Sequence, residues 1–450
     1  MFTDFLLEVF SEFRDEEALV WHGDSYDYAW LGGRIPYWVD FLRSRDISPG
    51  TVVALEGDFS PNSVALFLAL VENGCITVPL TKSVAHKRDQ FVDISEVQMS
   101  LIVDEDDQVQ ISTADGVGAH PLYDQLRDGH RPGLVLFSSG STGESKASVH
   151  DFASLLEKFK IRRRRLRTIS FLLYDHIGGI NTMLYALSNG GCLITVKDRS
   201  PDAVLDAVDS HRVALLPTSP TFVNLILLSE AYKRHDLSSL EILTYGTEPM
   251  PESTLKRFHD LFPDIRLQQT YGLSEVGILR SKSRGSDSLW VKVGGEGFET
   301  RIVDGILQIR AESAMLGYLN AESPFTADGW FNTEDAVLVD GEYIKILGRE
   351  SEIINVGGEK VYPSEVENVI QQIDGVEEVT VFGQPNAIVG NIVCAKLRLR
   401  HGVDPDGVSA SVKKYCRDRL EPYKVPMKVV VDDQSQHGAR FKKDRANLGR

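Results

Sequence analysis

Short apolar runs alternate with longer amphipathic stretches along most of the chain. Runs rich in β-branched residues, such as Thr51–Leu55 and Cys75–Pro79, are typical of strands buried on both faces. A helix is expected between them, from Pro61 to Val71, because proline suits the first helical turn. The same alternation recurs at Gly133–Phe137, Thr168–Leu173, Cys192–Val196, Val213–Leu216 and Glu241–Thr244. This pattern predicts parallel sheets that are covered by helices on both faces.

The pattern changes near Asp287–Ile309, where shorter alternating runs are separated by turns such as Val303-Asp304-Gly305. This stretch predicts a small antiparallel or barrel-like section. A second unit follows Gly348, with helices at Pro363–Gln372 and Val408–Leu420 and strands at Val376–Phe382, Ile392–Leu399 and Met427–Val431. The predicted fold class is therefore α/β: a large N-terminal domain of parallel-rich sheets plus the barrel-like section, and a small α+β C-terminal domain.

Composition and charge narrow the classes of partner. The chain has 450 residues, with 48 Lys and Arg against 65 Asp and Glu, so its net charge is −17. Such an acidic balance argues against nucleic acid or an anionic membrane as the main partner. The longest apolar run, Val64–Leu80, is broken by polar residues and is too short to span a bilayer. With four scattered cysteines and no basic N-terminal leader, we expect a soluble cytoplasmic protein without a transmembrane segment.

An apolar strand leads directly into a loop rich in glycine and hydroxyl groups, LVLFSSGSTGESK at residues 134–146. Glycines let the backbone fold tightly, so that successive N–H groups and hydroxyls point inward and hold a polyphosphate. The loop is not a Walker loop, since Ser145 stands directly before Lys146. The predicted phosphate-binding residues are Ser138, Ser139, Gly140, Ser141, Thr142, Gly143 and Lys146.

This loop resembles the TSGSTGxPKG signature of the AMP-forming adenylate synthetases, which comprise acyl- and aryl-CoA ligases, nonribosomal adenylation domains and luciferases. The chain differs at Ser145 and Ala147, which replace the proline and the final glycine. The other blocks of the family follow in order, so the resemblance covers nearly the whole chain, and it is most like a free-standing acyl-CoA ligase. The segment YGLSE at 271–275 is similar to the YGxTE block of the family. That similarity implies that Tyr271 packs on adenine, Ser274 reaches the α-phosphate and Glu275 holds Mg²⁺.

Two further segments resemble nucleotide-binding blocks. The segment WFNTED at 330–335 is similar to the Y-x-T-G-D block, which implies that Asp335 binds the ribose hydroxyls, although Glu334 replaces the usual glycine. Arg349 would contact ribose or phosphate. An upstream segment resembles the loop that lies along the nucleotide and the acyl pocket, and it consists of Tyr245, Gly246, Thr247 and Glu248.

The segment from Gly348 to Lys360 resembles the boundary between the two domains of the family. The resemblance implies a large domain at 1–348, a hinge at 349–351 and a small mobile domain at 352–450. Gly357 and Gly358 would form a loop that lines the pantetheine tunnel. Near the C-terminus, RFKKDR at 440–445 resembles a closing block whose lysine bonds the carboxylate and the α-phosphate. That role falls to Lys442, although Phe441 replaces a glycine of the block, and Lys443 is a weaker candidate for the same role.

The acyl pocket is expected beside the segment YDHIGG at 174–179. In CoA ligases of the family a histidine here gates or lines the pocket, which implies this role for His176. A competing alignment would make Asp175 the residue that binds a substrate α-amino group in amino-acid adenylation domains. The histidine followed by two glycines fits the ligase pattern better. By resemblance, the other candidates to line the pocket are Ile180, Thr218–Phe222, Tyr245, Gly246 and Ile278.

The resemblance implies an enzyme that uses ATP and Mg²⁺ to convert a carboxylic acid into an acyl-adenylate and then transfers the acyl group to a thiol. The thiol belongs to CoA or to the phosphopantetheine of an acyl or peptidyl carrier protein. The segment EPYKVP at 421–426 resembles one found in free-standing acyl-CoA ligases and favours CoA. The alternatives are an enzyme that loads a carrier protein and a nucleotide-binding relative without catalysis. The basic run Arg162–Arg167 is interpreted as a solvated surface turn or as a site for a phosphate of the second substrate.

Overall fold

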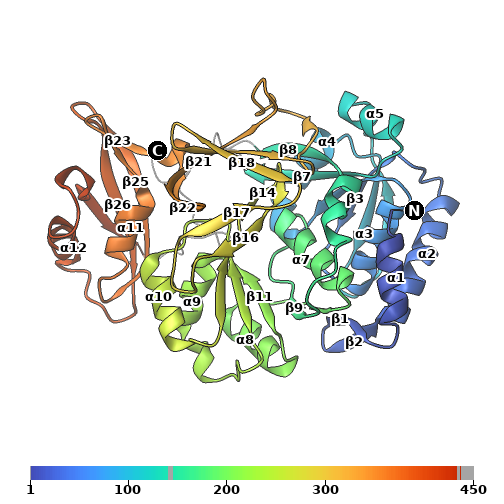
Figure 1. The fold of residues 1–450 in the computed structure, drawn as a ribbon, viewed down its shortest axis with the longest axis horizontal. Coiled ribbons are helices and arrows are strands. Elements are labelled where there is room, and N and C mark those ends of the chain that lie inside the picture. The colour runs from blue at the N-terminus through green and yellow to red at the C-terminus, as the bar shows by residue number, and fades with distance from the viewer. Residues whose placement is uncertain (1, 140–144, 433–435, 437–450) are drawn as a thin grey trace.

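The protein is described from a computed structural model that covers residues 2–139, 145–432 and 436. A large N-terminal part is joined to a smaller C-terminal part, drawn in orange and red in Figure 1. Among the described residues, the N-terminal part contains three large sheets and a two-stranded one, and the C-terminal part contains one more sheet. The division into a large and a small part follows the predicted fold class.

The first sheet has the strand order β20-β8-β7-β4-β3-β5-β6. Its central strands β7, β4, β3 and β5 are parallel, while the edge pairs β5–β6, β7–β8 and β8–β20 are antiparallel. Its strands are β3 (Val52–Glu56), β4 (Ile76–Leu80), β5 (Met99–Val103), β6 (Val109–Thr113), β7 (Gly133–Ser139), β8 (Ser145–Asp151) and β20 (Gly317–Tyr318). The strands predicted at Thr51–Leu55 and Cys75–Pro79 are thus confirmed to within one residue.

The second sheet has the order β13-β12-β11-β9-β10-β1-β2, and all its pairs are parallel except β1 with β2. Its strands are β1 (Glu17–Trp21), β2 (Asp24–Asp27), β9 (Arg167–Ile169), β10 (Cys192–Ile194), β11 (Leu215–Thr218), β12 (Ile242–Tyr245) and β13 (Arg266–Gln269). The strand that the sequence predicts at Thr168–Leu173 is longer than the observed strand. β9 ends at Ile169, and the chain then turns towards the helix at Ile177–Ser188, which His176 caps.

The main core lies between these two sheets. Buried side chains of the helices α1, α2, α3 and α7 pack there against strands from both sheets. The helices of the N-terminal part are α1 (Asp4–Glu12), α2 (Tyr28–Ser44), α3 (Pro61–Glu72), α4 (Arg88–Ile94), α5 (Pro121–Asp128), α6 (Phe152–Leu156), α7 (Ile177–Ser188), α8 (Pro201–Ser210), α9 (Pro220–Ser229) and α10 (Glu252–Leu261). Short 3₁₀ helices are η1 (Lys82–Lys87), η2 (Glu157–Phe159), η3 (Ala231–Lys233), η4 (Glu350–Glu352) and η5 (Pro422–Lys424).

The third sheet confirms the predicted change to antiparallel structure. Its order is β16-β17-β22-β21-β19-β18, and its pairs are antiparallel. The predicted turn at Asp304-Gly305 joins β18 to β19 with φ values of 51° and 79°, which suit a tight two-residue hairpin. The strands are β14 (Gly272–Leu273), β15 (Gly277–Ile278), β16 (Arg280–Ser283), β17 (Val291–Gly294), β18 (Phe298–Val303), β19 (Ile306–Ala311), β21 (Phe331–Asp340) and β22 (Tyr343–Arg349), of which β14 and β15 form the two-stranded sheet.

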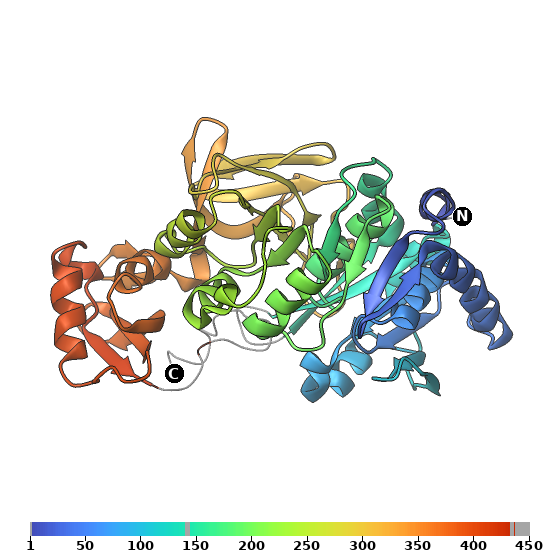
Figure 2. The ribbon, with the colours of Figure 1, turned by 90° about the horizontal axis from the view of Figure 1, so that it is seen from below.

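The C-terminal part has its own core, built from one sheet and two helices. Its elements are β23 (Ile354–Val356), β24 (Glu359–Val361), α11 (Pro363–Ile370), β25 (Val376–Asn386), β26 (Gly390–Leu399), α12 (Val408–Arg417) and β27 (Lys428–Val431). Figure 2 shows this part beside α9 and α10. The amide of Asn224 on α9 donates to the carbonyl of Glu377 over 3.2 Å, and the N–H of Glu252 on α10 donates to Asn368 over 3.2 Å.

Two further features concern the sequence expectations. All four cysteines are buried and free of disulfides, as expected for reduced core residues. Across residues 2–139, 145–432 and 436, none of the helices combines the length and the hydropathy that crossing a membrane requires.

Candidate active site

Two cavities meet at the carboxyl ends of β12 and β13. The larger cavity has a volume of about 470 Å³ and the smaller one about 100 Å³. The residues that line both are Gly246, Thr247, Thr270 and Gly272. Ligands bind preferentially at the carboxyl ends of parallel strands, where the loops that follow the strands converge. The shared wall therefore marks the place where a ligand in one cavity meets a ligand in the other.

The smaller cavity holds three side chains that the sequence assigns to the nucleotide. The hydroxyl of Tyr271 donates to Oδ2 of Asp335 over 2.6 Å. Nε of Arg349 lies 3.7 Å from Oδ1 of the same carboxylate, since Asp335 and Arg349 are paired residues on β21 and β22. Burial, and then the charge of Asp335, raise the pKa of Tyr271 well above its usual value, so its hydroxyl stays a donor.

The backbone beside Asp335 explains a departure from the family pattern. Glu334 has a φ of 60°, in the left-handed region that favours glycine. Its N–H donates to Oδ1 of Asn332 over 3.1 Å, and the N–H of Asp335 donates to the hydroxyl of Thr333 over 3.0 Å. The usual glycine of the family block therefore corresponds to a real conformational demand, which this chain meets with a glutamate.

Glu275 lies beside β7, the strand that carries the predicted phosphate-binding residue Ser138. Its Oε1 accepts a hydrogen bond of 2.8 Å from the hydroxyl of Tyr318 and lies 3.5 Å from the hydroxyl of Ser138. Tyr318 belongs to β20, which pairs with β8, and Nζ of Lys146 lies 5.4 Å from the centre of its ring. Ser274, which precedes Glu275, is buried as well. Tyr318 was not singled out from the sequence, because a lone tyrosine on a two-residue strand carries no signal of its own.

Some predicted residues fall outside the described part of the chain. In the phosphate loop, Ser138, Ser139 and Lys146 lie on the paired strands β7 and β8. The loop residues Gly140, Ser141, Thr142 and Gly143 lie outside the described residues, and so does Lys442.

The loop after β12 forms the wall between the two cavities. A Cβ atom on Gly246 would lie 2.7 Å from the hydroxyl of Thr270, so only glycine fits there. Thr247 has a φ of 74°, a strained conformation for a β-branched residue of the kind that concentrates at functional sites. Glu248 borders the smaller cavity but not the larger one, and its carboxylate accepts from the N–H of Thr221 over 2.8 Å at the start of α9.

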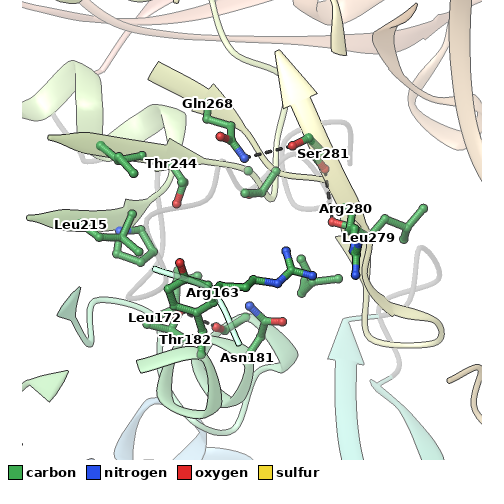
Figure 3. A pocket seen from close by; sticks show the side chains of 18 of the residues that line it. Arg163, Leu172, Asn181, Thr182, Leu215, Thr244, Gln268, Leu279, Arg280 and Ser281 are labelled. Atoms are coloured by element: carbon green, nitrogen blue, oxygen red, sulfur yellow. Dashed lines mark hydrogen bonds between the residues drawn. The ribbon is translucent and has the colours of Figure 1, made fainter. Parts of the chain in front are cut away.

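One wall of the larger cavity is a face of the second sheet. Successive strands contribute alternate residues in register, because side chains of a strand alternate between its two faces. These rows are Leu215, Ile242 and Arg266 at the amino ends, then Pro217, Thr244 and Gln268, and then Gly246 and Thr270 at the carboxyl ends. The opposite wall includes Asn181 and Thr182 of α7 (Figure 3), and Tyr185 of the same helix also lines the cavity.

The expected lining of the acyl pocket is only partly correct. His176, Thr218, Gly246 and Ile278 do line the larger cavity. Tyr245 does not, because it lies between two lining residues of one strand and so points to the other face. Ile180 and Phe222 are buried in hydrophobic clusters away from the cavity, and Ser219 to Thr221 form the start of α9 instead of its lining.

The structure separates His176 from Asp175. His176 lines the larger cavity and caps α7, since its Nδ1 accepts from the N–H of Gly178 over 3.1 Å. The buried carboxylate of Asp175 accepts from the hydroxyl of Thr81 over 2.7 Å, and Asp175 is not part of the lining. Of the two residues, His176 is therefore the one that borders the larger cavity.

The residues around the expected hinge connect the two parts of the chain. The third sheet ends at Arg349, and Ser351 lies in η4 directly before the first strand of the C-terminal part. Gly357 and Gly358 form the turn between β23 and β24, with φ values of 61° and 95°, and they line neither cavity. A separate small pocket lies between the two parts of the chain. The residues that line it include Gln436, Thr221, Glu248 and Glu378.

Comparisons with known proteins agree with this geometry. The AMP-binding enzyme family matches residues 7–319, and the AMP-binding enzyme C-terminal domain matches residues 365–442. The chain belongs to the AMP-binding enzyme family. The family expectation drawn from the motifs is confirmed.

The relatives and the fold point the same way. The chain is 26% identical to an indoleacetate–CoA ligase of Aromatoleum aromaticum, over 90% of this chain and 89% of that protein. It is 27% identical to a feruloyl-CoA synthase of an Amycolatopsis species, over 92% of this chain and 91% of that protein. The crystal structure of the anthranilate CoA ligase AuaEII with anthranoyl-AMP matches with a TM-score of 0.81 at 18% identity, covering 98% of this chain and 96% of that one. The fold class is therefore confirmed.

Proposed function

We propose that this enzyme of the AMP-binding family joins a carboxylic acid to CoA through an acyl-adenylate. The observation that carries the proposal is the shared wall at Gly246 and Thr247, which brings a cavity with nucleotide-binding groups against a cavity of acyl size. A cavity of about 470 Å³ is within the usual range for a small organic ligand. The relatives named above act on carboxylic acids and CoA, which supports this reading.

The first step activates the acid. A carboxylate is a poor acyl donor because its leaving group would be oxide. Attack of a carboxylate oxygen on the α-phosphorus of ATP forms a new P–O bond, breaks the bond to the bridging oxygen and releases pyrophosphate. Both reactants are anions, so the work of the enzyme is positioning and charge neutralisation. The acid would lie in the larger cavity with its carboxylate at Gly246 and Thr247, facing the α-phosphate.

The side chains of the smaller cavity would hold the nucleoside. The Asp335 carboxylate can accept two hydrogen bonds from ribose hydroxyls while Tyr271 and Arg349 fix its orientation. The ring of Tyr271 would pack on adenine. The phosphates would lie against Ser138, Ser139, Lys146 and the loop 140–143, with Ser274 near the α-phosphate.

Glu275 fits a Mg²⁺ site shared with the phosphates. Mg²⁺ prefers oxygen ligands and is usually held by one or two carboxylates together with substrate phosphates. Glu275 supplies such a carboxylate beside Ser138, and the hydroxyl of Tyr318 holds its Oε1 in place. When bound, the ion would offset the negative charge of the phosphates.

The second step needs a different arrangement of the C-terminal part. The thiol sulfur attacks the carbonyl carbon of the adenylate, AMP leaves with the bonding electron pair, and the thiol proton passes to solvent. We propose that residues 352–450 turn about 349–351, which would bring Gly357 and Gly358 to the pantetheine arm and withdraw Lys442. Before that turn, Gln436 stands beside Glu248, and the six residues from there to Lys442 span at most about 20 Å. This reach is compatible with a role of Lys442 in the first step.

A carrier protein remains the alternative acceptor. The segment 421–426, which favours CoA by resemblance, has a structural task as well, since Nζ of Lys424 lies 2.6 Å from Glu365 on α11. The two acceptors are separated by offering the adenylated enzyme either free CoA or a phosphopantetheinylated carrier. Thioester formation on CoA supports the proposal, and thioester formation on the carrier alone contradicts it.

The test of adenylation is exchange of labelled pyrophosphate into ATP that depends on an added carboxylic acid. A panel of aliphatic, aryl and amino acids is compared with Lys442→Ala and with Lys443→Ala, a matched neighbouring lysine. Exchange with one class of acid, lost in Lys442→Ala and kept in Lys443→Ala, is the expected result. A wild-type enzyme that binds ATP and exchanges with no acid would overturn the proposal in favour of a non-catalytic relative.

A further inference from the structure

The larger cavity is cationic although the chain as a whole is acidic. The cationic side chains that line it are Lys158, Arg163, Arg266 and Arg280, and the described residues of its lining include no aspartate or glutamate. The whole chain carries a net charge of −17. Arg280 pairs with Glu296 outside the lining, but in the described part of the chain Lys158, Arg163 and Arg266 pair with no carboxylate. A cavity for a purely apolar acid has no need of such cations, since they lose hydration next to an apolar ligand without compensation. The lining therefore points to a ligand with negative charge of its own.

None of these four cationic side chains lines the smaller cavity, so the cations lie on the side of the shared wall that faces away from the nucleotide groups. Arg266 stands in the row of residues at the amino ends of the strands, paired with Ile242. The backbone of Arg163 lies at the same end, because its neighbour Arg164 pairs with Glu241, which directly precedes β12. Ile242 and Gly246 are four positions apart along one strand, which corresponds to a distance of about 13 Å. An anion beside Arg266 would therefore lie well away from the shared wall, whereas Lys158 lies nearer to it, since its Nζ donates to Ile278, the strand partner of Gly272.

Arg163 differs from the other arginines of its run. The four others pair with glutamates at the surface, in the pairs Arg162–Glu12, Arg164–Glu241, Arg165–Glu16 and Arg167–Glu17. The side chain of Arg163 instead extends into the larger cavity between Asn181 and Arg280 (Figure 3). Within the part of the chain that the structure describes, its guanidinium pairs with no carboxylate. The basic run is thus a surface turn for most of its length, with one residue turned to the cavity.

Lys158 strengthens the positive character of the same region. Its Nζ donates to Asn181 over 2.7 Å and to the carbonyl of Ile278 over 3.0 Å, so one of its three donors is left for a ligand. Burial, together with the charge of Arg163, lowers its pKa to about 7. Burial raises the pKa of Tyr185, whereas the charges of Arg163, Arg164 and Arg266 act in the opposite direction. These groups therefore influence one another across one small volume.

We propose that the acid activated by this enzyme is a dicarboxylate, whose second carboxylate is bound by Arg163 inside the larger cavity. This inference rests on the proposed function, since it takes the larger cavity as the acyl site. Arg163 supplies the planar fork that binds a carboxylate through two hydrogen bonds, and Lys158 adds a further donor.

The test compares matched acids in the pyrophosphate exchange assay. Octanoic, decanoic and dodecanoic acids are paired with the diacids of the same length, and the proteins are wild type, Arg163→Leu, Arg163→Lys and Arg164→Leu. Arg164 is the matched control, because it is adjacent and pairs with Glu241 outside the cavity. We expect wild type to have a KM for the best diacid that is about 10- to 100-fold lower than for its monoacid partner. Arg163→Leu should abolish that preference, Arg163→Lys should restore part of it, and Arg164→Leu should keep it.

The outcomes separate the two proposals. Exchange with monoacids, without preference for any diacid and without an effect of Arg163→Leu, would overturn the dicarboxylate and leave adenylation standing. An effect of Arg163→Leu on the KM for CoA alone would assign Arg163 to the thiol substrate and would also overturn it. If no acid supports exchange, the proposed function fails, and calorimetric binding of decanedioic acid to wild type and Arg163→Leu then decides. Binding lost in the variant supports an anion site at Arg163, and equal binding refutes it.

Discussion

The hydroxyl of Tyr271 donates a hydrogen bond of 2.6 Å to the carboxylate of Asp335, which also faces the guanidinium of Arg349. The two residues come from sequence blocks 64 positions apart, and the third sheet brings one of them against the loop that carries the other. One oxygen of the carboxylate is thus held by Tyr271, and the group is aimed into the smaller cavity. We propose that this carboxylate binds the ribose.

The first prediction concerns the discrimination of nucleotides. Asp335→Ala should raise the KM for ATP about 10- to 100-fold, because a charged acceptor for the ribose hydroxyls is lost. Wild type should prefer ATP to 2′-deoxy- and 3′-deoxy-ATP, and the variant should lose that preference. Tyr271→Phe, which keeps the ring, is the matched control and should weaken discrimination only in part. Equal discrimination by wild type and Asp335→Ala would remove Asp335 from the ribose.

The second prediction concerns Glu275 and its partner. Glu275→Gln should raise the Mg²⁺ concentration needed for half-maximal exchange by about 10- to 100-fold, since a neutral amide is a poor ligand for a hard cation. Tyr318→Phe should shift the same midpoint by a smaller factor, because it removes only the hydroxyl that positions Oε1. The measurement is a Mg²⁺ titration at saturating ATP and acid. A titration midpoint that is unchanged in Glu275→Gln would contradict the assignment.

The third prediction tests the backbone at Glu334. Glu334→Gly should leave the melting temperature equal to or above that of wild type, because glycine adopts a φ of 60° without steric cost. Glu334→Val should destabilise the protein by about 1–2 kcal/mol, because a β-branched side chain is strained there. Thermal unfolding of the two variants is the measurement. If valine is tolerated as well as glycine, the left-handed conformation is not required at this position.

The fourth prediction follows from the buried ammonium of Lys158. Its pKa is lowered from 10.5 to about 7, so between these values the folded state binds fewer protons than the unfolded state. The contribution of this group to stability therefore rises with pH from about 7 towards 10.5, and below pH 7 its burial penalty is greatest. The melting temperature of wild type should gain more between pH 7 and pH 9 than that of Lys158→Met. The exposed Lys160 provides the control variant Lys160→Met, which should follow wild type. A pH dependence equal in wild type and Lys158→Met would contradict the burial of this charge.

Much of the fold and the motif residues could be predicted from the sequence, because their signals are local. The strands β3 and β4 are continuous apolar runs, and Asp335 is the last residue of the recognisable block WFNTED at 330–335. The lining of the larger cavity was predicted less well. Tyr245 was included although strand alternation turns it to the other face, and Ile180 was included although it packs into the main core. Whether a side chain points into a cavity depends on the packing of several elements, which one sequence does not contain.

The contribution of Arg163 illustrates the same limit. In the sequence it is one arginine among five between residues 162 and 167 and cannot be told from its neighbours. Only the folded chain pairs four of them with glutamates from two distant segments, residues 12–17 and residue 241, and turns the remaining one towards the larger cavity. Tyr318 is a second example, because its contact with Glu275 exists only through the pairing of β20 with β8.

The central claim is that a carboxylate oxygen attacks the α-phosphorus of ATP. It is tested most directly by supplying an accepted acid whose carboxylate is labelled with oxygen-18, together with ATP and CoA, and by mass spectrometry of the nucleotide and phosphate products. With attack on the α-phosphorus, we expect that the AMP released with the thioester carries one labelled oxygen and that pyrophosphate carries none. Label in inorganic phosphate with release of ADP would mean attack on the γ-phosphorus, and it would contradict the acyl-adenylate mechanism.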